Sequence, residues 1–136
     1  MKKTEKCYTN RELSWLQFNE RVLNEAGNPR VPLAERMTFA SIYQTNLDEF
    51  FMVRVGTLMM QMNAKEKVIE NKTGMTSEEQ VKEILARVCL LEKKKATIYE
   101  QLMGELEPKG IRIINFNRLS NEEGRLLEQY FDAHIA

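Results

Sequence analysis

The residues best suited to chemistry lie at positions 46–54, in the run NLDEFFMVR, within an otherwise apolar stretch. This run contains a carboxamide (Asn46), two carboxylates (Asp48 and Glu49) and a guanidinium (Arg54). On a helix, Asn46 shares an apolar stripe with residues three or four positions apart, namely Phe39, Ile42, Phe50 and Val53. A polar amide on such a stripe needs hydrogen-bond partners, because leaving it unpaired costs about 1–3 kcal/mol.

The partners of Asn46 decide its role. An asparagine can read the edge of an adenine, since it donates to a ring nitrogen and accepts from the amino group. A buried asparagine that is satisfied by a backbone group or by another helix is the structural alternative. The spacing of residues leaves both explanations open.

The charged members of the run have simpler expected roles. Asp48 and Glu49 are adjacent, so on a helix they point about 100° apart and cannot act as a facing acid–base pair. We expect them to form a partly solvated helix edge that pairs with arginines. Arg54 shares a face with apolar residues, and we expect its partner to be a carboxylate from a neighbouring helix.

No catalytic or metal site can be assembled from the remaining residues. His134 has no activating partner at helical spacing and is expected in solvent or in packing. Cys7 and Cys89 match no metal or redox spacing, so no zinc site is expected. The chain also lacks both common glycine-rich phosphate loops.

The elements that must position these residues read as helices. The spacing at positions 9–12 (TNRE) predicts a helix start, and the Gly-Asn-Pro at 27–29 predicts its end. Positions 33–62 predict one long, mostly buried helix with Gly56 as its weak point, in which four methionines (Met52, Met59, Met60 and Met62) fill gaps between helices. A second capping pattern at 76–79 starts an amphipathic helix that ends near position 107. We therefore predict an all-α, three-helix bundle with two long antiparallel helices over residues 1–107.

The last segment, residues 108–136, changes character. Its β-branched positions 111–114 (IRII) predict a strand, and the capping pattern at 120–123 predicts a helix. A lone strand is not a stable element. We expect this segment to be the truncated β-α start of an α/β head domain.

Charge and hydropathy exclude several protein classes. Twenty basic and twenty acidic residues cancel, which disfavours nucleic-acid binding. No secretory signal and no apolar run of about 18 residues is visible. With free thiols, this favours a cytoplasmic location.

Three ordered blocks closely resemble the N-terminal domain of bacterial polyphosphate kinases: positions 12–26 (ELSWLQFNERVLNEA), 32–37 (PLAERM) and 46–54 (NLDEFFMVR). The resemblance implies an enzyme that reversibly transfers the terminal phosphate of ATP to inorganic polyphosphate, using Mg²⁺ and a phosphohistidine. That histidine lies in later domains of the family, so we expect no catalytic residue here and no activity of this chain alone.

The resemblance assigns one site residue to this chain, because Asn46 matches the family asparagine that contacts the ATP base. It further implies a homo-oligomer, a dimer or tetramer, and leaves attachment to the inner face of the membrane open. Polyphosphate would bind through the later domains. The alternative is a helical packing or oligomerisation module without nucleotide contact.

Overall fold

The computed structural model describes residues 9–64, 68–70 and 72–136, and all the named secondary-structure elements in these ranges are helices or helical turns. Cys7 lies outside the described residues. The helices are α1 (Arg11–Ala26), α2 (Leu33–Phe50), α3 (Gly56–Met62), α4 (Ser77–Leu106) and α5 (Asn121–His134). Shorter helical turns are η1 (Phe51–Val55), η2 (Glu107–Lys109) and η3 (Phe116–Arg118).

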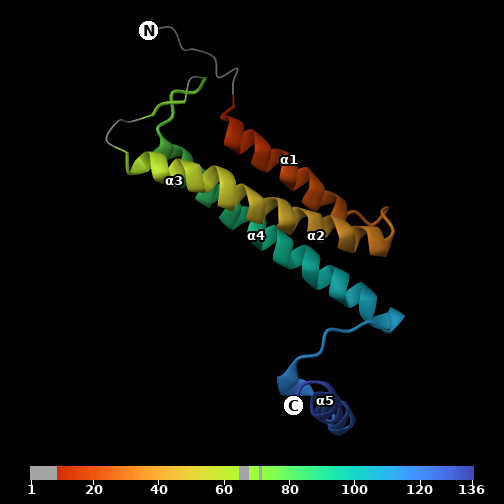
Figure 1. Cartoon of the computed structure of the whole chain (residues 1–136). Coiled ribbons are helices and arrows are strands. Elements are labelled where there is room, and N and C mark those ends of the chain that lie inside the picture. The colour runs from red at the N-terminus through yellow and green to blue at the C-terminus, as the bar shows by residue number, and fades with distance from the viewer. Residues whose placement is uncertain (1–8, 65–67, 71) are drawn as a thin grey trace.

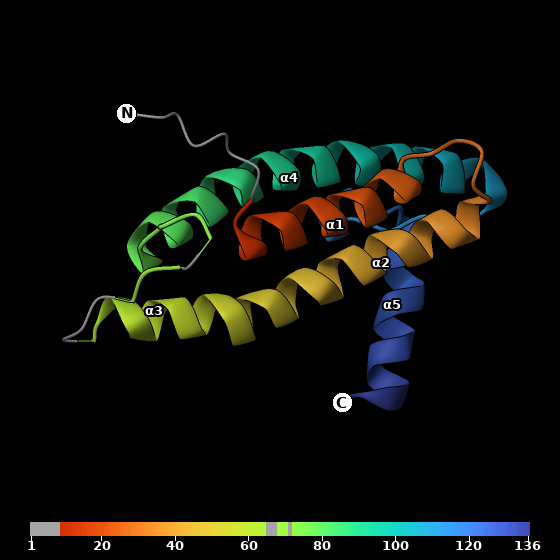
Figure 2. The same ribbon diagram turned by 90° about the horizontal axis from the view of Figure 1, so that it is seen from above.

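Three helical rods lie side by side in Figures 1 and 2, and these are α1, the continuous α2–η1–α3, and α4. The middle rod runs antiparallel to the other two, so that the two long helices are antiparallel, as predicted. The core between the rods is apolar and includes Leu16, Leu23, Leu47, Ile84 and Leu102. Among the described helices, none is long and apolar enough to cross a membrane.

Helix α1 begins where the sequence indicated, but with a different cap. The cap is Asn10, whose side chain accepts from the backbone N–H groups of Glu12 and Leu13 at 2.9 and 3.3 Å. Its amide also donates to Gln80 of α4 at 3.0 Å, which ties the two helix starts together. The helix ends at Ala26, as expected. Gly27 follows with φ −91°, so its glycine serves close packing and not a left-handed turn.

The long middle helix contains a π-helical turn, η1, which the sequence reading did not predict. Phe50 and Val55 are five positions apart and both are buried, which is the spacing of a π turn and not of an α turn. The helix is also less buried than predicted. Its four methionines are exposed, Met52 to 75%, so the prediction that they fill gaps between helices is wrong.

Helix α4 begins with the complete predicted capping box, in which Thr76 accepts from the N–H of Glu79 and the Glu79 carboxylate accepts in return. Before it, a single antiparallel bridge joins Ile69 to Thr76. Far along α4, buried Arg36 of α2 connects to Glu105 at 2.5 Å and donates through Nε to the C-terminal carbonyl of Ala26 at 3.1 Å. This arginine fastens the ends of three helices at one point.

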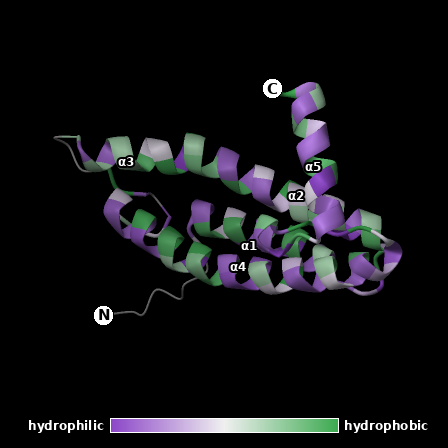
Figure 3. Cartoon of the chain, turned by 90° about the horizontal axis from the view of Figure 1, so that it is seen from below, coloured by the Kyte–Doolittle hydropathy of each residue, from purple (hydrophilic) through white to green (hydrophobic). Residues whose placement is uncertain are grey.

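The C-terminal segment stands apart from the three rods in Figure 1. Positions 111–114 have no regular secondary structure and are exposed, so the predicted strand is absent from the described chain. A strand needs a neighbour for its backbone hydrogen bonds, and none is present among the described residues. The predicted helix does form as α5, with the capping box at Ser120 and Glu123 complete. Hydrophobic residues recur along α5 in Figure 3, and its larger ones are exposed: Leu126, Leu127, Tyr130 and Phe131.

Candidate functional site

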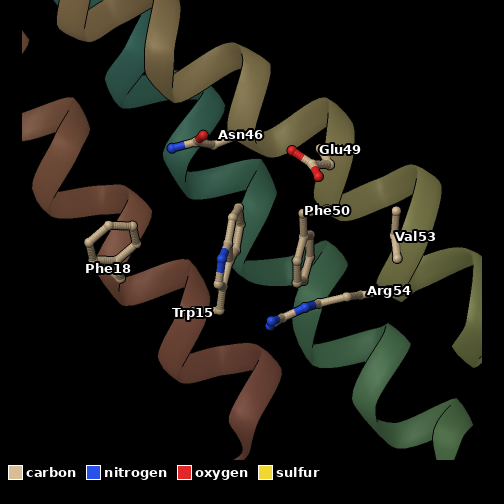
Figure 4. Close-up of a pocket in the computed structure, with 7 residues that line it drawn as sticks. All are labelled: Trp15, Phe18, Asn46, Glu49, Phe50, Val53 and Arg54. Carbon is tan, nitrogen blue, oxygen red and sulfur yellow. The ribbon is translucent and has the colours of Figure 1, made fainter.

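A hollow of about 240 Å³ lies between α1 and the α2–η1 helix, directly over the predicted run. In Figure 4 the rings of Phe18, Trp15 and Phe50 lie across the middle of the view, with Asn46 and Glu49 on one side of them and Arg54 on the other. The lining residues are Trp15 and Phe18 from α1 with Asn46, Glu49, Phe50, Val53 and Arg54 from α2 and η1. Ligand pockets for drug-sized molecules measure about 300–1,000 Å³, so this hollow fits part of such a ligand.

The aromatic part of the hollow contains two stacked rings. The rings of Trp15 and Phe50 lie 4.4 Å apart between centroids and 2° from parallel. Phe18 lies on the other side of Trp15 from Phe50 in Figure 4 and is 50% exposed. Phe50 is buried, whereas Trp15 is partly exposed and Phe18 exposed, so these two rings are the surfaces on which a planar base could stack.

The main polar side chain of the hollow is Asn46, whose hydrogen-bond partner is Asn19 of α1. The Nδ2 of Asn46 donates to the Oδ1 of Asn19 at 3.1 Å, and the Nδ2 of Asn19 donates to the backbone carbonyl of Tyr43 at 3.1 Å. No described residue donates to the Oδ1 of Asn46, and only one of its two N–H groups has a partner. Asn46 is therefore anchored to the fold at one end and keeps one acceptor and one donor for the hollow.

Arg54 closes one end of the hollow. Its Nη1 lies 3.2 Å from the carboxylate of Glu12, and its guanidinium lies 5.9 Å from the centroid of the Trp15 ring. The expected carboxylate partner from a neighbouring helix is thus confirmed. Because Glu12 balances its charge and Trp15 faces it, Arg54 has a structural role that holds α1 against η1.

The expectation for the two carboxylates is confirmed in one respect and wrong in another. Asp48 accepts from Gln44 at 2.8 Å on the exposed side of α2, and Glu49 is exposed at the rim of the hollow, so both lie on the predicted solvated helix edge. Neither pairs with an arginine among the described residues, so the predicted pairing is wrong. Arg54, which lines the same hollow as Glu49, is paired with Glu12.

Tyr43, beneath the amide pair, adds no acid or base. Burial raises the pKa of Tyr43 to about 12, and the nearby carboxylates of Glu92 and Glu20 add to the shift. Its hydroxyl stays protonated at neutral pH. Tyr43 thus gives the site no proton-transfer group, and the one carboxylate that lines the hollow is that of Glu49.

The other candidates lie away from the hollow. His134 is exposed on α5, where it stacks on Tyr130 at 4.5 Å and its Nδ1 lies 3.1 Å from the Tyr130 carbonyl. Cys89 is a free, exposed thiol. Within the described ranges, no group of three or more His, Cys, Asp or Glu side chains could hold a metal ion.

The sequence reading missed three residues of the site. It gave Trp15, Phe18 and Asn19 no role in a site. A signal was present, because positions 15, 18 and 19 are three and four apart and so share one helical face. A face that combines two aromatic residues with an asparagine is unusual for a core.

The chain matches known proteins over most of its length. Residues 8–114 match the model of the polyphosphate kinase N-terminal domain. A polyphosphate kinase of Bacillus cereus is 45% identical over 94% of this chain, and one of Synechocystis is 43% identical over 94%. In both cases the chain spans 18% of the relative's length.

A solved structure supports the same assignment. The crystal structure of polyphosphate kinase from Porphyromonas gingivalis superposes with a TM-score of 0.65 at 29% identity, covering 92% of this chain and 17% of that one. The matched family model, the relatives and the fold all agree. The chain belongs to the polyphosphate kinase N-terminal domain family.

Proposed function

We propose that this chain is the N-terminal part of a polyphosphate kinase, and that its hollow forms the adenine side of the ATP site. The whole enzyme would reversibly transfer the terminal phosphate of ATP to inorganic polyphosphate. The observation that carries the proposal is the half-satisfied amide of Asn46 beside the Trp15–Phe50 stack. Adenine offers an amino donor and a ring-nitrogen acceptor, which match the free acceptor and donor of this amide.

The size and charge of the hollow fit the base and not the phosphates. At about 240 Å³ it takes a planar ring system, and its one cation, Arg54, is already paired with Glu12. A triphosphate needs several cationic or backbone donors. We assign those donors, the phosphohistidine and polyphosphate binding to the remainder of the longer protein.

Mg²⁺ belongs with the phosphates in the same proposal. The hollow offers one carboxylate without an ion pair, Glu49, beside the guanidinium of Arg54. Mg²⁺ requires an octahedral set of oxygen ligands, and this donor set does not fit it. These residues therefore do not hold the metal.

Asn46→Ala in the full-length enzyme tests the proposal. Removing two hydrogen bonds to the base, at about 0.5–1.5 kcal/mol each, raises the KM for ATP about 5- to 150-fold. The kcat changes little, because the reacting phosphate lies far from the base edge. Thr45→Ala is the matched control, since Thr45 is exposed on the same helix and does not line the hollow.

The alternative is a helical packing and oligomer module without nucleotide contact. It predicts an unchanged KM for ATP in Asn46→Ala and altered subunit assembly when the exposed apolar residues of α5 are replaced. We favour the nucleotide site because the free Oδ1 and N–H of Asn46 lie in a hollow that is also lined by Trp15 and Phe18, where a planar base could reach them. A dimeric or tetrameric enzyme in the cytoplasm, with or without contact to the inner membrane face, is compatible with both. The chain alone is expected to make no polyphosphate.

A further inference from the structure

Asn19 is a fully buried polar residue whose two hydrogen bonds fix the orientation of its carboxamide. It is 0% exposed and lies in α1, opposite the middle of α2. Its carboxamide donates to the carbonyl of Tyr43 and accepts from Asn46, both at 3.1 Å. The Tyr43 carbonyl lies inside α2, where the helical ladder already supplies a donor. Asn19 is therefore not required to satisfy it.

The Tyr43 carbonyl and the carboxamides of Asn19 and Asn46 form a chain of two hydrogen bonds, and its donors and acceptors can be arranged in only one way. A backbone carbonyl can only accept, so Asn19 must turn its N–H₂ toward Tyr43. Its oxygen then faces Asn46 and must meet an N–H. If the Asn46 amide flipped, two oxygens would face each other without a proton between them, in a largely buried position.

This direction determines what Asn46 presents to the hollow. The free groups are the Oδ1 and the second N–H, in an order that cannot reverse. A 6-aminopurine such as adenine places an amino donor against the Oδ1 and a ring nitrogen against the N–H. A 6-oxopurine such as hypoxanthine places a carbonyl oxygen where the amino group would be, and this oxygen is repelled by the Oδ1.

We propose that Asn19 is a positioning residue that makes the hollow selective for 6-aminopurine over 6-oxopurine nucleotides, by locking the amide of Asn46 through the Tyr43 carbonyl. This inference rests on the proposed function, since it requires Asn46 to contact the base. The inference adds to the proposed function a residue, Asn19, that does not contact the nucleotide, and a preference for 6-aminopurines that follows from the orientation of Asn46.

The experiment compares ATP with ITP, which carry the same ribose and triphosphate and differ at position 6 of the purine. The readout is the ratio of kcat/KM for ATP to kcat/KM for ITP in the full-length enzyme. A correctly ordered bidentate amide gives the parent a preference for ATP of about 5- to 150-fold. In Asn19→Leu the amide of Asn46 turns freely and accommodates either purine, so the ratio falls at least about fivefold.

Asn19→Asp separates orientation from stability. Its carboxyl group still accepts from the N–H of Asn46, while its second oxygen faces the Tyr43 carbonyl, so this variant is less stable but retains the ATP preference. Gln80→Leu is the control for loss of a buried amide, because Gln80 is 5% exposed and bonds to Asn10, away from the hollow. Its ratio stays at the parent value.

Each outcome supports or overturns the inference. A ratio near one in the parent overturns it, as does an unchanged ratio in Asn19→Leu or a lost ratio in Asn19→Asp. If Asn19→Leu does not fold, a parent ratio near one or a lost ratio in Asn19→Asp still overturns the inference. An Asn46→Ala variant with raised KM for ATP beside an unchanged Asn19→Leu ratio would leave the proposed function standing and remove only this inference.

Discussion

Replacing Arg36 by methionine should destabilise the bundle more than any other single loss of charge in α2. Arg36 is 5% exposed, and its Nε–H bonds to the Ala26 carbonyl, which terminates α1 and has no helical donor. A buried hydrogen bond from a charged donor contributes about 1.5–3 kcal/mol. The ion pair with Glu105, whose side chain is 50% exposed, adds about 0–1 kcal/mol.

Methionine keeps the apolar stem and removes only the guanidinium, so the expected loss in the free energy of unfolding is about 2–4 kcal/mol. With a urea m-value of about 2 kcal/mol/M, the midpoint falls by about 1–2 M. The assay is urea unfolding of the chain followed by fluorescence of Trp15. This is the only tryptophan in the sequence, and it is packed against Phe50, so it reports the core.

The matched control is Arg87→Met, which removes the same charge from a partly exposed site. The Arg87 side chain is 42% exposed and pairs with Glu20 at 2.7 Å, so its loss costs about 0–1 kcal/mol. The effect of Arg87→Met should shrink in about 1 M salt, where exposed pairs are screened, and the effect of Arg36→Met should persist. Equal midpoint shifts for the two variants would refute the reasoning.

Three further changes test the caps, the π turn and the acid response. Thr76→Ala removes the cap of α4 and lowers the free energy of unfolding by about 1 kcal/mol in urea titrations. Gly56→Ala raises it by about 0.5–1 kcal/mol in the same assay, because the new Cβ meets its nearest atom at 3.7 Å. Burial acts to raise the pKa of Glu20, but Lys94 and Arg87 outweigh it, so this pKa lies below its usual 4.5 and the stability it contributes is lost as pH falls through that lowered value. Glu20→Gln should therefore flatten the loss of stability between about pH 6 and pH 3, measured by urea midpoints.

The cap and glycine changes each have a counterpart that should behave differently. Ser120→Ala removes an equally complete capping box from α5, which stands outside the bundle, so it should leave the Trp15 midpoint unchanged. Gly27→Ala should destabilise, because its Cβ meets the Ile98 side chain at 3.2 Å. Equal effects within either pair, or an unaltered acid response in Glu20→Gln, would contradict these assignments.

Local signals predicted the helices of this fold well. The capping patterns at Thr76 and Ser120 both form complete boxes, and the first helix ends at the predicted glycine. These features depend on neighbours within four residues, which a sequence displays directly. The strand at 111–114 failed for the opposite reason, since a strand depends on a partner supplied from elsewhere.

The candidate site was predicted in part. Asn46 could be singled out from the run that contains it, but its true partner, Asn19, lies 27 residues away in α1. The spacing of residues left open whether the Asn46 amide is structural or binds a ligand. In the structure one N–H of Asn46 makes a structural hydrogen bond to Asn19, and its Oδ1 has no partner among the described residues. The π turn could not be predicted from the sequence for a related reason. The joint burial of Phe50 and Val55 depends on tertiary packing, which the spacing of apolar residues in the sequence does not show.

The π turn changes how insertions and deletions in this protein should be interpreted. Each residue of an α-helix advances it by about 100°, so one residue lost from α2 would rotate everything after it by that amount. Arg54 would then leave Glu12 and Trp15, and the buried face of α3 would turn toward solvent. One residue lost from η1 would instead convert the π turn to an α turn and keep the buried residues on either side of it on one face, so η1 is the place in this helix where a one-residue gap leaves the two halves in phase.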